Sequence, residues 1–294
     1  MKFVTNDYGC GTSSSILDYD NGKHAIIVSP DNWHHVLDVK EDICMVGHDF
    51  LLYMWDNDEK VKLWQNFQYK IYVWCFERIN AIIPEWKIKS YFSINQIKKF
   101  AHKILACDEN DCDEFGYDWF PQWASPRFFE NKNIPITQGK KILFSGQAGK
   151  PEYFLRNKLL EEMKNDDFFK DLLVIKNNTR SLTEDEYMKN LLSYKYILNP
   201  IGVLEAFNVR SFEVLYSNRI LLQQVTREYK RHNSLIKGFN NCITFTDLNE
   251  LKNKLKNTRL ENKSFYIENN LQKRLNTLKN EKFNISFSCN KKVV

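Results

Sequence analysis

The sequence has no cysteine arrangement typical of a disulfide framework or a zinc site. Its seven cysteines are an odd number at irregular spacing, and the closest pair, Cys107 and Cys112, has four residues between its members. No Cys-x-x-Cys pair occurs, and no histidine follows a cysteine at zinc spacing. These absences argue against a disulfide-rich secreted scaffold and a zinc finger, and they indicate free thiols in a reducing compartment.

Long apolar runs are also absent. No stretch of 18 apolar residues occurs, and the first residues, "MKFVTNDYGCG", contain no apolar signal core. We therefore expect no transmembrane span and a cytoplasmic location. The many Lys, Asn and Ile residues are typical of an AT-rich genome, bacterial or viral, and for a viral protein the location would be the host cytoplasm.

The charge is unevenly distributed along the chain. The 294 residues carry a net charge of +5, and 43% of them are hydrophobic, enough for a sizeable core. Residues 252–294 hold eleven Lys/Arg against three Glu. This basic segment is either a solvated helix face or a surface for nucleic acid, an anionic membrane or a phosphorylated ligand.

Short apolar runs alternate with helical patterns through both halves of the chain. Such alternation predicts parallel α/β sheets. A Pro- and Trp-containing stretch at 115–140 separates the halves, and Ser181 or Thr183 is the expected N-cap of a helix. The expected strands lie within 23–30, 41–50, 69–77, 102–109, 140–150, 171–178, 196–202, 219–225 and 241–247, and the expected helices within 57–67, 93–101, 153–165, 181–195, 209–218, 248–257 and 264–280.

The stretch "NPIGVLEAFNVRSFEVLYSN" (199–218) carries the clearest chemistry. Gly202 permits close approach to a ligand, and a helix beginning near residue 209 presents free N–H groups that favour an anion. Arg210 adds a fork of donors suited to phosphate. Glu213 can accept the vicinal hydroxyls of a ribose, and Glu205 can reach a second polyol. The set predicts a sugar nucleotide; surface acids paired with Arg210 or Lys195 are the alternative.

Within that stretch, "EAFNVRSFE" resembles the Glu-x7-Glu motif of retaining glycosyltransferases of the GT-B fold, especially family 4-like members. Glu205, Phe207 and Glu213 match, whereas Ala206 and Asn208 replace two glycines. "NVRSFEVL" also resembles spore-maturation-type and exostosin-like glycosyltransferases. "ILFSGQAGKPEYFLR" (142–156) is similar to the strand and loop that open their nucleotide-binding domain.

The resemblance implies a GT-B fold, with two Rossmann-like α/β domains facing each other across a cleft. We expect an N-terminal acceptor domain over 1–138, a nucleotide-sugar domain over 139–262, and a closing helix and basic tail over 263–294. The donor, a UDP-sugar in our interpretation, would contact residues on the loops and helix starts of the second domain. They are Gly146, Lys150, Arg156, Gly202, Arg210, Ser211 and Glu213.

The resemblance implies transfer of a sugar to an acceptor hydroxyl with retention. We also expect Lys150, Arg156, Arg210 and the helix end to stabilise the leaving diphosphate, without a metal or other cofactor. Glu205 is the expected catalytic residue of the second domain; if it has another role, an inverting mechanism with an acid of the first domain becomes possible. A non-catalytic nucleotide- or nucleic-acid-binding protein on the same scaffold is the alternative.

The first half is expected to hold the acceptor, either a glycan or a hydroxylated base in DNA. His48 and Glu77 follow apolar strands and are the candidate catalytic residues there, although His48 is equally well explained as a turn residue. Trp74, Trp86, Trp119 and Trp123 are candidates for stacking, or core residues. A loop at the acceptor side would contain Gly9, Gly11, Thr12 and Ser13. The basic C-terminal segment is a possible nucleic-acid contact.

Overall fold

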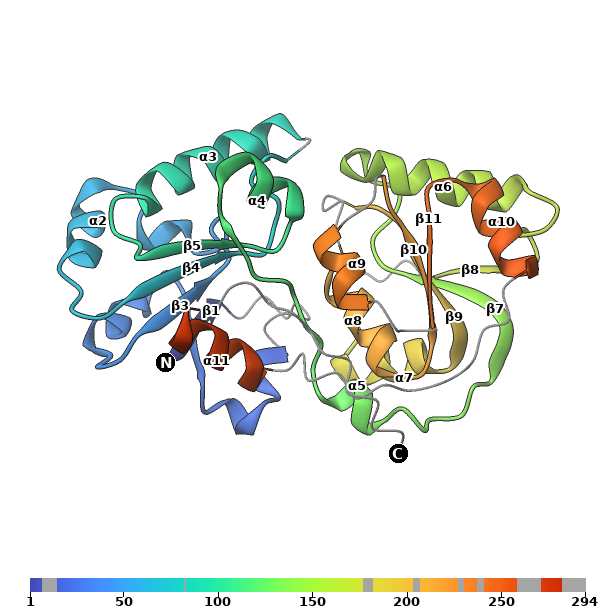
Figure 1. Cartoon of the computed structure of the whole chain (residues 1–294), viewed down its shortest axis with the longest axis horizontal. Coiled ribbons are helices and arrows are strands. Elements are labelled where there is room, and N and C mark those ends of the chain that lie inside the picture. The colour runs from blue at the N-terminus through green and yellow to red at the C-terminus, as the bar shows by residue number, and fades with distance from the viewer. Residues whose placement is uncertain are drawn as a thin grey trace. The chain divides into compact units, whose positions relative to one another are not determined.

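The computed structural model describes residues 1–6, 15–81, 83–176, 182–202, 207–226, 230–236, 241–257 and 271–281. They form two compact units (Figure 1). The first unit comprises the described residues of Met1–Ser125 and Asn269–Ile285, and the second those of Pro126–Glu268. The chain thus changes unit at residue 126, ahead of the boundary expected at 138.

The first unit contains a six-stranded sheet in the order β2-β1-β3-β4-β5-β6, with every neighbouring pair parallel. The central strands β3 and β4 are buried along their whole length, as expected where helices cover both faces of a parallel sheet. The strands are β1 (Lys2–Asn6), β2 (Ala25–Val28), β3 (Ile43–Val46), β4 (Ile71–Cys75), β5 (Lys103–Ala106) and β6 (Asp118–Trp119). The helices are η1 (Asp20–Gly22), η2 (Trp33–Asp38), η3 (Leu52–Met54), α2 (Asp58–Gln65), α3 (Pro84–Ile97) and α4 (Glu109–Phe115).

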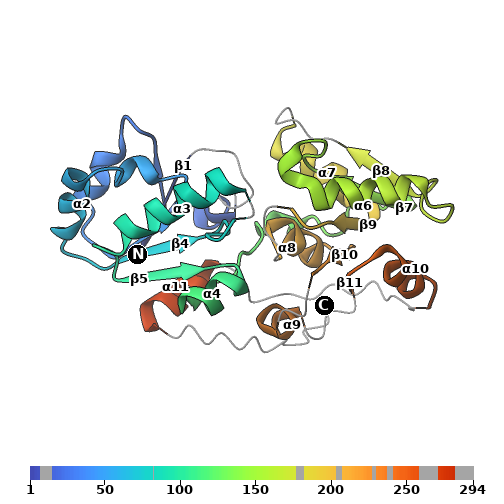
Figure 2. The same cartoon turned by 90° about the horizontal axis from the view of Figure 1, so that it is seen from above.

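Helix α11 (Leu271–Asn280) packs on the first unit although it lies far along the sequence (Figure 2). The Tyr72 hydroxyl donates to the Leu278 carbonyl at 3.4 Å and to the Glu281 carboxylate at 3.2 Å. Glu281 also contacts His102 at 3.0 Å and pairs with Lys70. The expected helix over 264–280 is confirmed from residue 271 onward; the basic tail lies outside the described residues.

The second unit contains a five-stranded parallel sheet in the order β11-β10-β9-β7-β8. The Thr183 hydroxyl caps α7 in a capping box with Glu186, which confirms the predicted N-cap. The strands are β7 (Gln138–Ser145), β8 (Leu173–Lys176), β9 (Tyr194–Asn199), β10 (Ile220–Gln224) and β11 (Cys242–Phe245). The helices are α5 (Arg127–Glu130), η4 (Pro151–Tyr153), α6 (Phe154–Asn165), α7 (Glu184–Leu192), α8 (Val209–Tyr216), α9 (Lys230–Ile236) and α10 (Leu248–Asn257). No helix in the described ranges is long and apolar enough to cross a membrane.

Arg219 ties the start of the second unit to its sheet. The residue is 2% exposed, and its guanidinium donates to four backbone carbonyls. The partners are Lys132 (3.2 Å), Ile134 (2.6 Å), Ser217 (2.9 Å) and Leu192, the last accepting from Nε at 2.8 Å. Burial lowers the pKa of Arg219 to about 10. The cation therefore satisfies carbonyls of the segment after residue 126, which would otherwise be left without donors.

Replacing Arg219 with Met should lower the free energy of unfolding by about 3 kcal/mol or more, because several buried carbonyls lose their donors together. Urea denaturation monitored by circular dichroism measures the change. The control is Lys158→Met on α6, whose side chain is 73% exposed and which should have little effect. An equal, small loss in both variants would show that Arg219 does not hold this segment.

Candidate functional site

Two arginines from different helices converge beyond the carboxyl end of β7. Arg156 of α6 and Arg210 of α8 lie against the ring of Phe144, at 5.5 and 5.8 Å from its centroid. Arg156 is 7% exposed, and burial followed by the charge of Arg210 lowers its pKa to about 10. Neither forms an ion pair with a carboxylate among the described residues. The edge of the sheet therefore holds two positive charges with no described carboxylate at ion-pair distance, although Glu213 is near enough for the charge of Arg210 to affect its pKa.

Each guanidinium has an N–H group that makes no hydrogen bond. Arg156 Nη1 donates to the Gln147 carbonyl at 2.7 Å, and Arg210 Nη1 donates to Asn199 Oδ1 at 3.2 Å. The Nε atoms of both arginines are buried and have no hydrogen-bond partner. Since buried donors are nearly always paired, these two indicate a missing acceptor.

Two glycines make room for the pair. A Cβ added to Gly146 would lie 2.8 Å from Nη2 of Arg210, and one added to Gly202 would overlap Nη2 of Arg156. The structure thus brings together four of the predicted donor-binding residues, but the glycines accommodate the arginines instead of lying open to a ligand.

A buried amide and hydroxyl network holds Arg210 in place. Asn199 Nδ2 donates to Ser211 Oγ at 2.9 Å and to Gln223 Oε1 at 2.8 Å, and Ser211 donates to the same Gln223 oxygen at 2.8 Å. Ser211 is fully buried. Its hydroxyl is used inside the protein, so the expectation that it contacts the donor is replaced by a role in positioning Asn199 and, through it, Arg210.

Glu213 is a buried acid with a hydroxyl partner. It is 4% exposed, and its Oε2 accepts a hydrogen bond from Tyr187 of α7 at 2.7 Å. Burial raises the pKa of Glu213 to about 7, against the opposing effects of the Tyr187 hydrogen bond and the Arg210 charge. This burial is incompatible with the alternative that Glu213 is a solvated surface acid.

The other predicted residues of the second unit lie elsewhere. The Lys150 side chain is 58% exposed and lies 3.9 Å from Glu152, so it is not part of the buried arginine cluster. Glu205 lies outside the described residues, as does the loop with Gly9, Gly11, Thr12 and Ser13.

In the first unit, His48 and Glu77 follow the neighbouring strands β3 and β4. His48 is fully buried, which lowers its pKa, and neither ring nitrogen has a hydrogen-bond partner. Glu77 is half-buried. Burial, and then the charge of Asp49, raise the pKa of Glu77 to about 8.

The tryptophans do not form a common stacking surface. Trp74 and Trp123 stack at 4.9 Å inside the core, and Trp119 is buried. Only Trp86 among the four is exposed, at 41%. The core alternative is therefore correct for three of them.

Three Asp-x-Asp triplets, a pattern able to hold a divalent cation, start at residues 18, 56 and 111. Asp56 and Asp58 pair with Lys60 and Lys99, at 3.0 and 2.9 Å. Asp111 accepts the backbone N–H of Ile79 at 2.7 Å. No group of three potential metal ligands is found in the described part of the chain.

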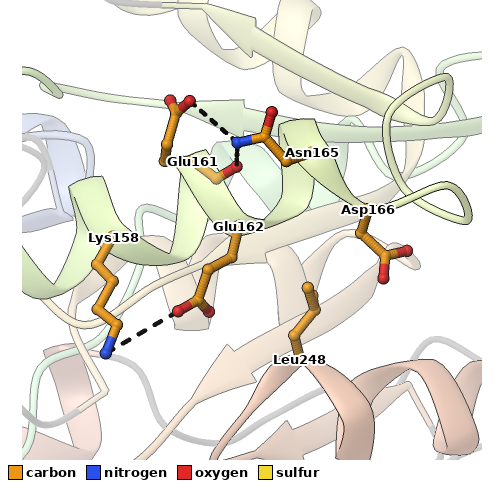
Figure 3. A pocket seen from close by; sticks show the side chains of 6 residues that line it. All are labelled: Lys158, Glu161, Glu162, Asn165, Asp166 and Leu248. Atoms are coloured by element: carbon orange, nitrogen blue, oxygen red, sulfur yellow. Dashed lines mark hydrogen bonds and ion pairs between the residues drawn. The ribbon is translucent and has the colours of Figure 1, made fainter.

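A cavity of about 540 Å³ lies between α6 and α10 and contains none of the predicted site residues (Figure 3). Its polar side chains are engaged with one another: Asn165 donates to Glu161 at 3.2 Å, and Lys158 lies 3.9 Å from Glu162. It is lined by Lys158, Glu161, Glu162, Asn165, Asp166 and Leu248. Nothing in it points to a ligand.

No protein-family model matches the chain, and no curated protein matches it.

The residues that sequence reasoning missed are Phe144, Asn199, Gln223, Tyr187 and Asp49. A signal existed for two of them, because Asn199 and Gln223 are polar residues that directly follow the apolar runs 197–198 in β9 and 220–222 in β10.

Glu213→Gln should change the pH dependence of stability. Because the folded-state pKa is raised from 4.5 to about 7, the folded protein holds an extra proton between these values. The contribution of protonated Glu213 to the stability of the fold is therefore full below pH 4.5, declines as the pH rises to about 7, and is absent above that pH. The neutral amide avoids this loss. The free energy of unfolding of the variant should therefore rise relative to that of the wild type by up to about 3 kcal/mol on going from pH 4 to pH 8.

Urea denaturation of both proteins between pH 4 and 8 measures the difference, in which the other titrating groups largely cancel. Glu161→Gln, at an acid that is 64% exposed, is the control and should show no trend with pH. A difference that stays constant with pH would contradict the raised pKa of Glu213.

Proposed function

We propose that the protein is a glycosyltransferase of the GT-B type that transfers a sugar from a nucleoside-diphosphate sugar, in our interpretation a UDP-sugar, to an acceptor hydroxyl. The observation that supports it is the pair of a buried cation, Arg156, and a half-buried one, Arg210, beyond the carboxyl end of β7. Neither has a carboxylate within ion-pair distance among the described residues, and the Nε of each is buried without a hydrogen-bond partner. Ligands of parallel α/β sheets bind at this edge.

A diphosphate matches the charge and the donors of this site. Each guanidinium can bind phosphate oxygens in a fork, and the ligand would supply negative charge at ion-pair distance, where no described carboxylate lies. The side chain of Asn208, the N-cap of α8, makes no capping hydrogen bond, so the first amides of α8 have no side-chain partner. As the bond to the sugar breaks, the same groups would stabilise the leaving diphosphate.

The remaining roles follow from the positions of the acids. Glu213, one turn into α8, would accept ribose hydroxyls with the carboxylate oxygen that Tyr187 does not use. The role of Glu205 at the transferred sugar and the retention of configuration rest on the resemblance of residues 205–213 to the Glu-x7-Glu motif. Independence from metal is part of the proposal because Arg156, Arg210 and the first amides of α8 would stabilise the leaving diphosphate. The first unit would bind the acceptor.

Binding should depend on the diphosphate. We expect UDP to raise the melting temperature, uridine to leave it unchanged, and Arg210→Gln to weaken UDP binding by roughly 10- to 100-fold, since a charge-assisted hydrogen bond contributes about 1.5–3 kcal/mol. Arg156→Gln should behave alike. Isothermal titration calorimetry gives the affinities, and a thermal-shift screen of UDP-, GDP- and dTDP-sugars identifies the donor.

Lys158→Gln is the matched control, because Lys158 is on the same helix as Arg156 but 73% exposed. Both arginine variants should fold at least as stably as the wild type, since each relieves repulsion between the buried Arg156 and the half-buried Arg210. Equal affinity for UDP in all variants, or no binding of any nucleoside diphosphate, would refute the proposed site. Turnover of labelled donor, absent in Arg210→Gln, then tests transfer itself.

A further inference from the structure

We propose that the carboxyl edge of the first sheet binds a neutral polyhydroxylated ligand through Asp49, Glu77 and His48. This inference rests on the proposed function. It identifies the acceptor of the transferred sugar as a sugar and not a nucleic acid.

The three side chains leave the sheet side by side. β3 and β4 are parallel neighbours with Val46 opposite Trp74, and the Gly47 N–H still donates to the Trp74 carbonyl at 2.9 Å. His48 and Asp49 therefore follow β3 next to the point where Glu77 follows β4. The rings of Phe50 and Phe76 stack at 5.2 Å and hold the two loops together.

All three groups have unused hydrogen-bonding capacity. His48 is fully buried, and its Nδ1 lies 3.9 Å from Asp49 Oδ1, beyond hydrogen-bond distance. Both ring nitrogens and that carboxylate oxygen are buried without a hydrogen-bond partner. The Asp49 side chain as a whole remains 21% exposed, and Glu77 is half-buried, so a ligand can reach the acids while His48 lies beneath. An unpaired imidazole beside two acids is costly unless something binds there.

The chemistry of the cluster favours hydroxyl groups. A carboxylate accepts hydrogen bonds from hydroxyls strongly, and an imidazole can donate to or accept from the same groups. Burial and Asp49 raise the pKa of Glu77 to about 8, so at neutral pH it also has a proton to donate. A sugar, whose hydroxyls both donate and accept, satisfies all of these groups.

A nucleic acid does not fit the charge of this edge. Besides Asp49 and Glu77, the buried acids Asp108 and Asp111 follow β5 in the same sheet. Residues 1–125 and 269–285, which belong to the first unit, carry 16 Lys/Arg against 20 Asp/Glu, whereas the rest of the chain carries 26 against 17. Binding a phosphate backbone depends on Lys and Arg, so the first unit is poorly suited to DNA.

An exposed aromatic ring lies on α3, the helix that also carries Lys89. Lys89 of α3 lies near enough to His48 to lower the pKa of the imidazole by its charge. Trp86 precedes Lys89 by three residues and so lies on the same side of α3. At 41% exposure it offers an apolar surface for the face of a sugar ring.

The test is ligand-observed saturation-transfer NMR on the full chain without donor. The probes are the methyl glycosides of glucose, galactose, mannose and N-acetylglucosamine at millimolar concentration. We expect at least one glycoside to show saturation transfer from the wild-type protein. Its affinity should fall roughly tenfold or more in Asp49→Asn and in Glu77→Gln. The matched control is Asp31→Asn, at an exposed acid of the same unit. Melting temperatures verify that each variant is folded.

Fluorescence anisotropy with single- and double-stranded DNA oligonucleotides is the second arm. Salt-dependent DNA binding that changes in Asp49→Asn but not in Asp31→Asn, or the absence of saturation with every glycoside, would overturn the inference. Arg210→Gln should keep glycoside binding while binding UDP more weakly. Glycoside binding without any UDP binding would therefore reject the transferase and keep this site, whereas UDP binding without glycoside binding would do the reverse.

Discussion

Two like charges packed against one phenylalanine ring are the constraint around which the second unit is organised. Arg156 and Arg210 meet over Phe144 because Gly146 and Gly202 have no side chains to occupy the space. Removing cations from water without a charged partner costs several kcal/mol, and their mutual repulsion adds to the cost. A fold retains such an arrangement most readily when an anion offsets it during function, which is why we favour a diphosphate at this position.

The same reasoning links the two proposed sites. Each lies where neighbouring parallel strands end, since the loops that follow these strands gather at one edge of the sheet. At each edge, buried polar atoms lack partners: guanidinium nitrogens in the second unit, and imidazole and carboxylate atoms in the first. The sign of the charge distinguishes them. The basic edge suits phosphate, whereas the acidic edge suits hydroxyl groups.

The polar residues around Arg210 show how a functional side chain is held without an ion pair. Asn199, Ser211 and Gln223 satisfy one another beneath the helix and leave one amide oxygen for Arg210. Glu213 is held in a related way by Tyr187. Neutral partners fix the geometry of each charged group without neutralising it, so the charge stays available to a ligand.

The sequence by itself determined the alternation of buried strands and helices, because an apolar run or a helical period reports which residues leave water. It indicated the strands around Ile43–Val46 and Ile142–Ser145 and the cap at Thr183, but missed β1, α4 and α5, which are short and carry weak periodicity. It also placed Arg210 and Glu213 on one helix. Only the tertiary structure decided that Arg156, not Lys150, joins Arg210, and that Asp49 joins His48 and Glu77. Such contacts between side chains depend on strand order and on the packing of helices far apart in the chain, which local sequence patterns do not encode.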